Sequence, residues 1–397
     1  MQQATSAQLR IGIVGAGTAG LATAIAFARS GHHVQVFEKH PSLATLGAGL
    51  LIQPQGVRAL SELGVRDEFN AASVPIDRLL GKNQRGWRLV DVAYPEHHAR
   101  AVSRSALAHL LLRAALAAGV EVRFNTPIEQ VETDGKLGCI RSASERMPFD
   151  LVVIADGASS VLPAQVGLAV PSSLYKWGAL WAMVDVDHWP HARVLQQRFR
   201  TTRQMFGLMP TERRGDKLRL SLFWSLPCAA YPAWKASSLD AWKAQLLDLW
   251  PESAPAVEQI HAHDQLTFAT YHHAWPRRLA NPPICIVGDA AHAMSPQLGL
   301  GATLAVQDAL LLAQHVNARG VAAGTLSFAK KRLPAVRAYQ ALSRTLTPCF
   351  QADGGGLWRD LLFAAGLHIP GVPWLMHRSI AEPQPRARLA VEEPDCA

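Results

Sequence analysis

The chain has 397 residues, of which 49% are hydrophobic and 18% are charged. This length is typical of two closely joined domains, and the composition excludes general disorder. The formal net charge of +8 fits either a basic solvated surface or an anionic partner, such as an acidic membrane surface. No Lys/Arg run with interleaved aromatic residues occurs, so we expect no nucleic-acid partner.

The cysteines and the two terminal segments predict the cellular compartment of the protein. The cysteines are odd in number and never spaced C-x-x-C, which predicts free thiols in a reducing, cytoplasmic compartment. Residues 1–9 are polar and carry no apolar run, so we expect no signal segment there. The apolar stretch 361–376 is broken by a histidine and two prolines, so we expect it to pack as core or cap, or to lie on a membrane, and not to span one. The histidine pairs have adjacent side chains that point in different directions, and we expect no metal site.

Up to about residue 170 the chain alternates between strand and helix patterns. Strands are expected at 9–14, 34–38, 120–124 and 151–155. Helices are expected at 17–30 and 54–63, and a further helix is expected from a Ser103 cap to a stop at Gly119. The first strand, helix and strand have the length of one parallel crossover unit.

After about Pro171 the sequence pattern changes. It predicts strands rich in aromatic and β-branched residues at 177–186, 194–200, 204–209 and 218–226. A helix is expected at 238–250, and a buried strand and a long helix follow at 284–287 and 302–316. We therefore predict an α/β fold in which a Rossmann-like domain is split by an inserted antiparallel-sheet domain. The expected boundaries are 1–170, 171–275, 276–380 with C-terminal helices, and a flexible tail at 381–397.

Residues Gly15–Gly20 read G-x-G-x-x-G, directly after the first strand and at the start of the first helix. Glycines let a diphosphate approach the backbone, and the helix N-terminus offers unpaired N–H groups and partial positive charge. Glu38 ends the second strand, 23 residues after Gly15, where an acid binds ribose hydroxyls. The pattern predicts dinucleotide binding, and by itself fits either FAD or NAD.

A second glycine-containing segment favours FAD. The strand at 284–287 ends in Gly288-Asp289, and Pro296 and Gly299-Leu300-Gly301-Ala302-Thr303 precede the long helix. Asp289 stands at a strand tip, where it suits a polyol hydroxyl. The glycines let backbone lie against a flat ring, and the helix start stabilises the negative charge of a reduced flavin.

From Leu9 to about Ala381 the sequence resembles the single-component FAD-dependent aromatic monooxygenases, the family of 4-hydroxybenzoate and salicylate hydroxylases. The resemblance is carried by the two segments above and by Asp156-Gly157 after the strand at 151–155. It implies an FAD-binding domain of the GR2 type, with Glu38 on the adenosine ribose, Asp289 on a ribitol hydroxyl and Pro296 beside the reactive edge of the flavin. With Arg104 matching an arginine that opens a helix near the FAD, the expected cofactor-binding residues are Gly15, Gly17, Ala19, Gly20, Glu38, Lys39, Gly49, Arg104, Asp156, Asp289, Pro296, Gly299, Gly301 and Ala302.

Two positions depart from the family pattern. The middle motif of the family reads D-G-x-x-S-x-x-R, and here Leu162 stands at the arginine position. This leaves the use of the electron donor open. Leu298 and Leu300 stand where the family often has small or polar residues, which suggests a more apolar flavin environment.

The resemblance also implies a reaction. NADH or NADPH reduces FAD, O2 adds to form a flavin C4a-hydroperoxide, and a small hydrophobic aromatic substrate is hydroxylated. Besides Pro296, the candidate catalytic residues are Tyr271 or His272 as a base for a phenol and Arg203 as a ligand for a carboxylate. Each of these residues also fits a role without catalysis, either as a core side chain or as a solvated surface side chain. The expected lining of the substrate site is Trp181, Arg203, Met205, Phe206, Trp224, Tyr271, His272 and His273, and His292 is interpreted as a structural hydrogen-bond partner.

Other functions fit the same motifs. One alternative is another flavin oxidoreductase, namely an epoxidase, a double-bond reductase or a halogenase. Phe223-Trp224-Ser225-Leu226-Pro227 is only superficially similar to the halogenase W-x-W-x-I-P motif, and no halogenase lysine is evident. The other alternative is a flavin-binding protein without catalysis. The sequence is compatible with either a monomer or a homodimer.

Overall fold

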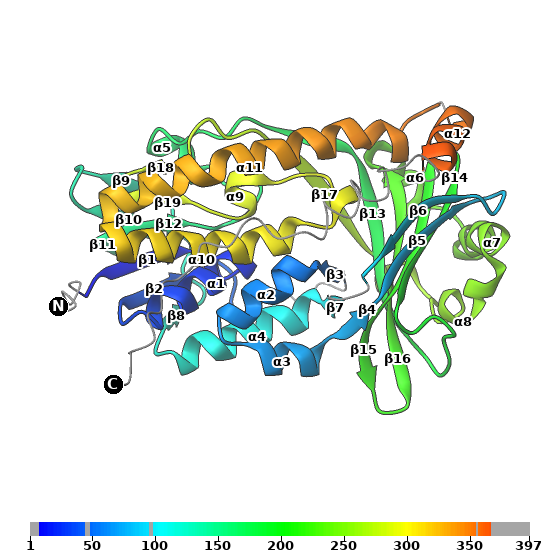
Figure 1. Cartoon of the computed structure of the whole chain (residues 1–397), viewed down its shortest axis with the longest axis horizontal. Coiled ribbons are helices and arrows are strands. Elements are labelled where there is room, and N and C mark those ends of the chain that lie inside the picture. Colours follow the sequence, from blue (N-terminus) through cyan, green and yellow to red (C-terminus); the bar gives the residue numbers. More distant parts are fainter. Residues whose placement is uncertain (1–7, 44–47, 95–97, 355, 367–397) are drawn as a thin grey trace, which may run out of the picture.

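The computed structural model describes residues 8–43, 48–94, 98–354 and 356–366. One half of the molecule is built on a six-stranded sheet with strand order β18-β19-β12-β1-β2-β8, on the left in Figure 1. Its strands are parallel except for the edge strand β18. The central strands are short apolar runs buried on both faces, as parallel sheets require. Their bounds are β1 Arg10–Val14, β2 His33–Phe37, β8 Glu121–Arg123, β12 Leu151–Ile154, β18 Ala280–Asn281 and β19 Ile284–Ile286.

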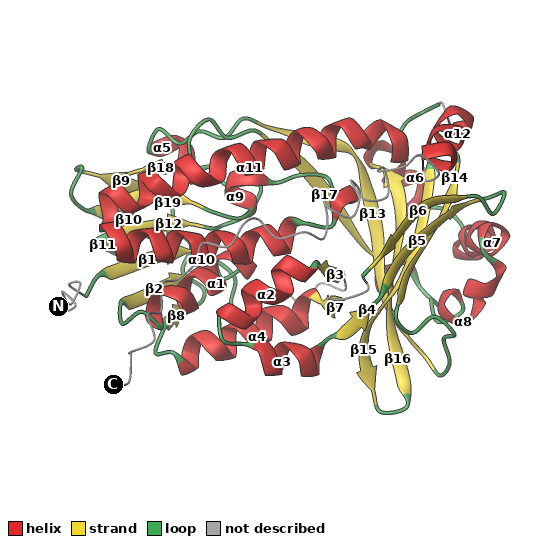
Figure 2. Cartoon of the chain, viewed as in Figure 1, coloured by secondary structure: helices red, strands yellow, loops and turns green. Residues whose placement is uncertain are grey.

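Helices cover one face of this sheet and a small antiparallel sheet, β11-β10-β9, covers the other (Figure 2). Gly12 of β1 allows the small sheet to approach, because a Cβ there would lie 2.6 Å from side-chain atoms of Ile140 and Phe149. The predicted Ser103 cap is confirmed, since its hydroxyl accepts from Ala106 N. The elements are α1 Thr18–Ala28, α2 Pro54–Glu62, α3 Arg66–Ala72, α4 Arg104–Ala117, β9 Gln130–Thr133, β10 Gly138–Arg141, β11 Arg146–Phe149, α5 Leu162–Gln165, α9 Asp289–His292 and α10 Gly301–Arg319.

The other half is a seven-stranded sheet with strand order β17-β13-β16-β15-β14-β5-β6, on the right in Figure 1. The sequence placed all of 1–170 in the first domain, but β5 and β6 leave that half and extend this sheet. They do so through a parallel pairing of β14 with β5. The pairings among β13 to β17 are antiparallel, as predicted, and β5 also pairs antiparallel with β6, which the sequence did not predict. The bounds are β5 Arg78–Asn83, β6 Arg88–Ala93, β13 Ser172–Val186, β14 Val194–Arg200, β15 Gln204–Arg214, β16 Lys217–Pro227 and β17 Thr267–Ala274.

The two faces of the seven-stranded sheet meet different neighbours. The back face packs under α6–α8, with Phe206, Trp224 and Trp250 in one apolar cluster. The front face, which includes Met205 and Phe223, packs against the three-stranded sheet β3-β7-β4 of the first half. The elements around the two faces are β3 Gly49–Ile52, β4 Val74–Ile76, β7 Ala99–Ser103, α6 Tyr231–Lys235, α7 Leu239–Leu249 and α8 Ala254–Val257.

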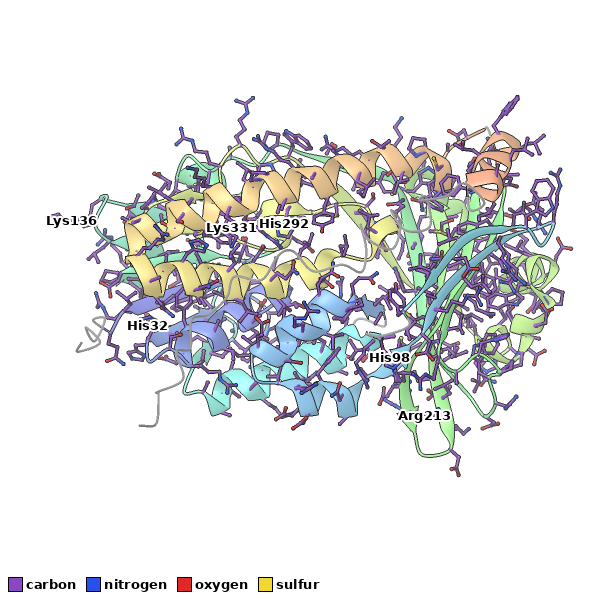
Figure 3. All side chains as sticks on the ribbon, viewed as in Figure 1. His32, His98, Lys136, Arg213, His292 and Lys331 are labelled. Carbon is purple, nitrogen blue, oxygen red and sulfur yellow. The ribbon has the colours of Figure 1, made fainter. Side chains whose placement is uncertain are left out.

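The helix α11 (Val321–Phe350) runs along both halves, and α12 (Gly356–Gly366) follows it beside the seven-stranded sheet (Figure 1). Figure 3 labels Lys136, in the β9–β10 turn at the left end of the molecule, and Arg213, near the end of β15 at its lower edge. The predicted flexible tail lies outside the described residues. Within the described ranges no helix is long and apolar enough to cross a membrane, and no group of three or more potential metal ligands occurs. Cys139, Cys228, Cys285 and Cys349 are free thiols, as predicted.

Candidate functional site

The first glycine-rich turn is shaped to bring backbone close to a ligand. Gly15 has φ +102°, and a Cβ there would lie 2.5 Å from the Ala155 carbonyl oxygen. Gly20 has no room either, because its Cβ would overlap the Gly15 carbonyl oxygen. Gly17 differs: it is exposed, and a Cβ there would meet no atom of the described residues within 4 Å. As the cap of α1 it leaves a helix start without an acidic side chain in the first turn, which suits an anion.

Glu38 ties this turn to the second strand. Its Oε2 accepts from Ala16 N at 2.9 Å and its Oε1 accepts from His40 N at 3.0 Å. The carboxylate is half-buried, and Lys39 next to it is exposed. Each oxygen keeps a lone pair, so the same carboxylate that orders the turn is also able to accept from ribose hydroxyls.

Asp156 is a second acid at this end of the sheet. Ser160 Oγ donates to its Oδ2 at 2.8 Å, while its Oδ1 is buried and has no partner among the described residues. Burial raises the pKa of Asp156, and the nearby charge of Lys39 opposes that rise. A buried acceptor without a donor is costly, so this atom fits a donor from a bound ligand. Leu162, which stands where the middle motif of the family has an arginine, starts α5 and is buried in the core.

The second glycine-containing segment, which begins at Gly288, packs directly on the first glycine-rich turn. Gly288 has φ +61°, and a Cβ there would lie 2.5 Å from the Cβ of Ala19 in α1. Asp289 follows it, exposed, at the first position of α9. Its Oδ1 is 4.0 Å from the Cβ position at Gly301, the first residue of α10. The two glycine segments, which lie far apart in the sequence, therefore form one continuous site.

The loop before α10 offers backbone rather than side chains. Pro296 begins a short 3-10 turn (Pro296–Leu298) and is half-buried, and Gly299 has a left-handed φ of +59°. Ala302 is half-buried in the first turn of α10. Leu298 and Leu300 are buried in a cluster with Leu304 and side chains of α11. Their apolar groups thus pack against α10 and α11, which explains the leucines as part of a core cluster.

Gln53 is a polar residue at this site that the sequence analysis missed. It is buried, Tyr94 OH donates to its Oε1 at 3.0 Å, and its backbone N donates to Thr303 Oγ1 at 3.2 Å. These bonds leave its Nε2 3.9 Å from the Cβ position at Gly299. No local motif marks it, because its partners lie beyond β6 and in α10, far from it in the sequence.

A network of buried charged side chains lies next to the second glycine-containing segment. The sequence analysis assigned a role to only one of its members, His292. His292 and Asp308 are both 1% exposed, and His292 Nε2 donates to Asp308 Oδ2 at 2.6 Å. The interpretation of His292 as a structural hydrogen-bond partner is confirmed; Figure 3 labels it. Arg332 of α11 completes the network. Burial opposes ionisation of Asp308, but the charges of Arg332 and His292 outweigh it and lower the pKa of Asp308 to about 2.

The candidate substrate residues divide between the two sheet faces. Trp181, Met205 and Tyr271 belong to the front side, where Trp181 packs beside Phe223. Phe206 and Trp224 were predicted to line the site, and this is wrong. They belong to the back face. Successive side chains of a strand point to opposite faces, and Phe206 and Trp224 directly follow the front-face residues Met205 and Phe223.

Tyr271 is poorly suited to be a base. Its hydroxyl accepts from Trp181 Nε1 at 3.0 Å, and burial raises its pKa to about 12, although the positive charge of Arg104 acts in the other direction. The phenol therefore stays protonated near neutral pH and is a hydrogen-bond donor. Arg104 itself starts α4, and its backbone N donates to the Ala48 carbonyl oxygen at 2.9 Å.

Arg203 does not fit its predicted role. It lies in the β14–β15 turn, its side chain is 61% exposed, and its ion-pair partner Asp353 is 91% exposed. A carboxylate ligand at such a solvated place gains little.

The remaining predicted site residues lie on β17, an edge strand of the seven-stranded sheet, and on β3. His272 lies on β17 with its Nδ1 3.4 Å from Ser172 Oγ, and His273 packs edge-on against Tyr175. Gly49 has a packing role, since its N donates to Ser221 Oγ and a Cβ there would lie 2.6 Å from Ser221 Cβ. None of these contacts places a proton acceptor beside the front-face aromatics.

A parallel sheet with a glycine turn and an acid at its second strand, joined to a second glycine segment, defines a dinucleotide-binding flavoprotein. Comparison with known families agrees, since the family described as FAD binding domain matches residues 8–342. The chain belongs to this family, and it is an FAD-dependent monooxygenase.

Relatives and solved structures are similar over most of their length. The chain is 27% identical to a probable 2-heptyl-3-hydroxy-4(1H)-quinolone synthase of Rhodococcus erythropolis, with 77% of this chain and 79% of the relative covered. It is 24% identical to 6-hydroxynicotinate 3-monooxygenase of Bordetella bronchiseptica, with 79% and 84% covered. Its fold matches that of Klebsiella pneumoniae HpxO complexed with FAD and uric acid, with a TM-score of 0.79, 20% identity, and 94% and 96% covered.

Proposed function

We propose that the protein uses NADH or NADPH and O2 to hydroxylate a small hydrophobic aromatic substrate. The observation that carries this proposal is the apolar front face of the seven-stranded sheet, with Trp181, Met209 and Phe223 turned toward the FAD-binding half. The quinolone and hydroxynicotinate in the names of the two relatives are heteroaromatic, which supports an aromatic substrate. A cytoplasmic location stays a prediction, as does the choice between monomer and homodimer.

The residues present fit FAD, and their proposed roles follow from the geometry. Gly15, Gly17 and Gly20 receive the diphosphate at the start of α1, and Glu38 accepts from the adenosine ribose. The unpartnered Oδ1 of Asp156 supplies a further acceptor, and Asp289 accepts from the ribitol chain. Bound FAD supplies the electron transfer and the activation of oxygen.

The chain's own contribution on the substrate side is placement and exclusion of water. The indole N–H of Trp181 holds the Tyr271 oxygen, so the phenol O–H is free to donate to an oxygen atom of the substrate. The apolar residues around it exclude water from the reacting atoms. Arg203, the predicted ligand of a substrate carboxylate, is solvated. This favours an uncharged substrate.

The test is a panel of phenols, quinolines and polyketide aromatics, scored by substrate-stimulated oxidation of NADH and of NADPH. Products formed under 18O2 are then analysed by mass spectrometry. One labelled oxygen atom in a ring hydroxyl supports the proposal, and an unlabelled product or an epoxide would contradict it. Phenols with and without a ring carboxylate form a matched pair, and the uncharged member should stimulate more strongly.

A further inference from the structure

The four-residue helix α9 is held at both of its ends by one carboxylate oxygen. Asp308 Oδ2 accepts from Gly288 N at 2.9 Å at the start of α9, and from His292 Nε2 at 2.6 Å at its last residue. So short a helix has little stability of its own. Its position therefore depends on Asp308, which lies on α10.

The other oxygen of the same carboxylate is fixed from a third helix. Arg332 of α11 donates from Nε to Asp308 Oδ1, and from Nη2 to the Leu304 carbonyl at 2.9 Å. Asp308 and Arg332 are 1% and 4% exposed. Buried charges are tolerated when they are paired and hydrogen-bonded, and removing one member leaves the others uncompensated. The network thus joins α9, α10 and α11 in one arrangement.

Asp289 is the residue that this arrangement directs toward the cofactor site. It is exposed, follows Gly288 directly, and has its Oδ1 near the start of α10 at Gly301. Asp308 is 19 residues further on and is buried away from the site surface. We propose that Asp308 is a positioning residue for FAD: it sets where Asp289 meets the cofactor by holding Gly288 and His292. This inference rests on FAD binding and is independent of the substrate proposed above.

The experiment measures FAD affinity directly, in apoprotein prepared from the full chain. Asp308→Asn should raise the dissociation constant for FAD at least tenfold, read from quenching of flavin fluorescence. The absorption bands of the bound flavin should shift as well, because its contacts change. Thermal midpoints of the apoproteins are recorded beside the affinities.

The chain offers a matched control in a second buried Asp–Arg pair. Asp360 of α12 accepts from Arg359 Nε at 2.6 Å and from Asn83 Nδ2 at 2.7 Å, and is 1% exposed. It packs beside the seven-stranded sheet and not at the FAD site. Asp360→Asn should lower the thermal midpoint yet leave the FAD dissociation constant within twofold of the parent value.

His292→Gln provides a milder variant, because glutamine keeps a hydrogen-bond donor at this position and leaves Asp308 and Arg332 in place. We expect a threefold to tenfold rise in the FAD dissociation constant. If Asp308→Asn does not fold, this variant decides: an unchanged affinity overturns the proposal and a raised dissociation constant supports it. If Asp308→Asn folds with lower thermal stability but unchanged FAD affinity and flavin spectrum, Asp308 is structural only and the proposal is wrong.

Discussion

The two faces of the seven-stranded sheet are built from the same strands and are both rich in apolar side chains, yet they differ in their neighbours and in their polar contacts. On the back face Phe206 packs edge-on against both Trp224 and Trp250, under a cover of short helices. On the front face Trp181 and Phe223 stand beside methionines, and the Trp181 indole donates to a tyrosine hydroxyl. The closed aromatic core of the back face and the proposed wall of the substrate site thus differ in their polar contacts, and not in hydrophobicity.

The largest expected effect lies on the back face. Trp224→Ala removes a side chain that is 3% exposed and leaves a cavity, so it should lower the free energy of unfolding by about 3–5 kcal/mol. Urea unfolding followed by tryptophan fluorescence measures this. The folded fraction should keep the FAD affinity and the KM of the parent. A raised KM would show that the two faces are coupled.

Exchanging tryptophan for phenylalanine on each face sharpens the comparison. Trp181→Phe removes the donor to Tyr271, and should raise the KM several-fold while costing about 1 kcal/mol of stability. Trp242→Phe is the control on the back side, because its buried Nε1 has no hydrogen-bond partner among the described residues. It should leave KM unchanged. Equal effects on KM from both variants would remove the distinction between the faces.

The pH dependence tests the state of Tyr271. Because its pKa is raised to about 12, the phenol stays protonated and should give no inflection in the rate between about pH 7 and 10. Burial favours the neutral phenol, so its contribution to stability is present below about pH 10 and is lost as the pH rises toward about 12. Rate–pH profiles of the parent and of Tyr271→Phe should therefore have the same shape. A basic limb that disappears in Tyr271→Phe would restore Tyr271 as a base.

The smallest effect is expected at Arg203. Arg203→Ala removes a solvated ion pair with Asp353, at 3.7 Å, and should change the free energy of unfolding by less than about 0.5 kcal/mol. The KM for acidic and for uncharged aromatics should remain that of the parent. A selective rise in KM for acidic substrates would return Arg203 to the site.

Elements with a strong local signal were predicted well. The strand 194–200 matches β14, and the helix expected at 302–316 lies within α10. The small sheets β3-β7-β4 and β11-β10-β9 were missed because most of their short strands contain polar or charged residues, unlike the continuous apolar runs of the equally short β12 and β19. The placement of β5 and β6 in the second sheet escaped prediction for another reason: strand partners far apart in sequence leave no local trace.

The amino-acid sequence alone determined the glycine turn with Glu38 and the Gly288-Asp289 segment, because phosphate approach and left-handed backbone require glycine at particular spacings. Only the tertiary structure decided that Gly288 rests on Ala19, that Arg332 of α11 holds Asp308, and which aromatic side chains face the FAD-binding half. The physical reason is the distance in sequence between the residues that interact. Backbone conformation is set by neighbouring residues, whereas a buried charge or a sheet face acquires its partners from helices and strands that meet only when the chain has folded.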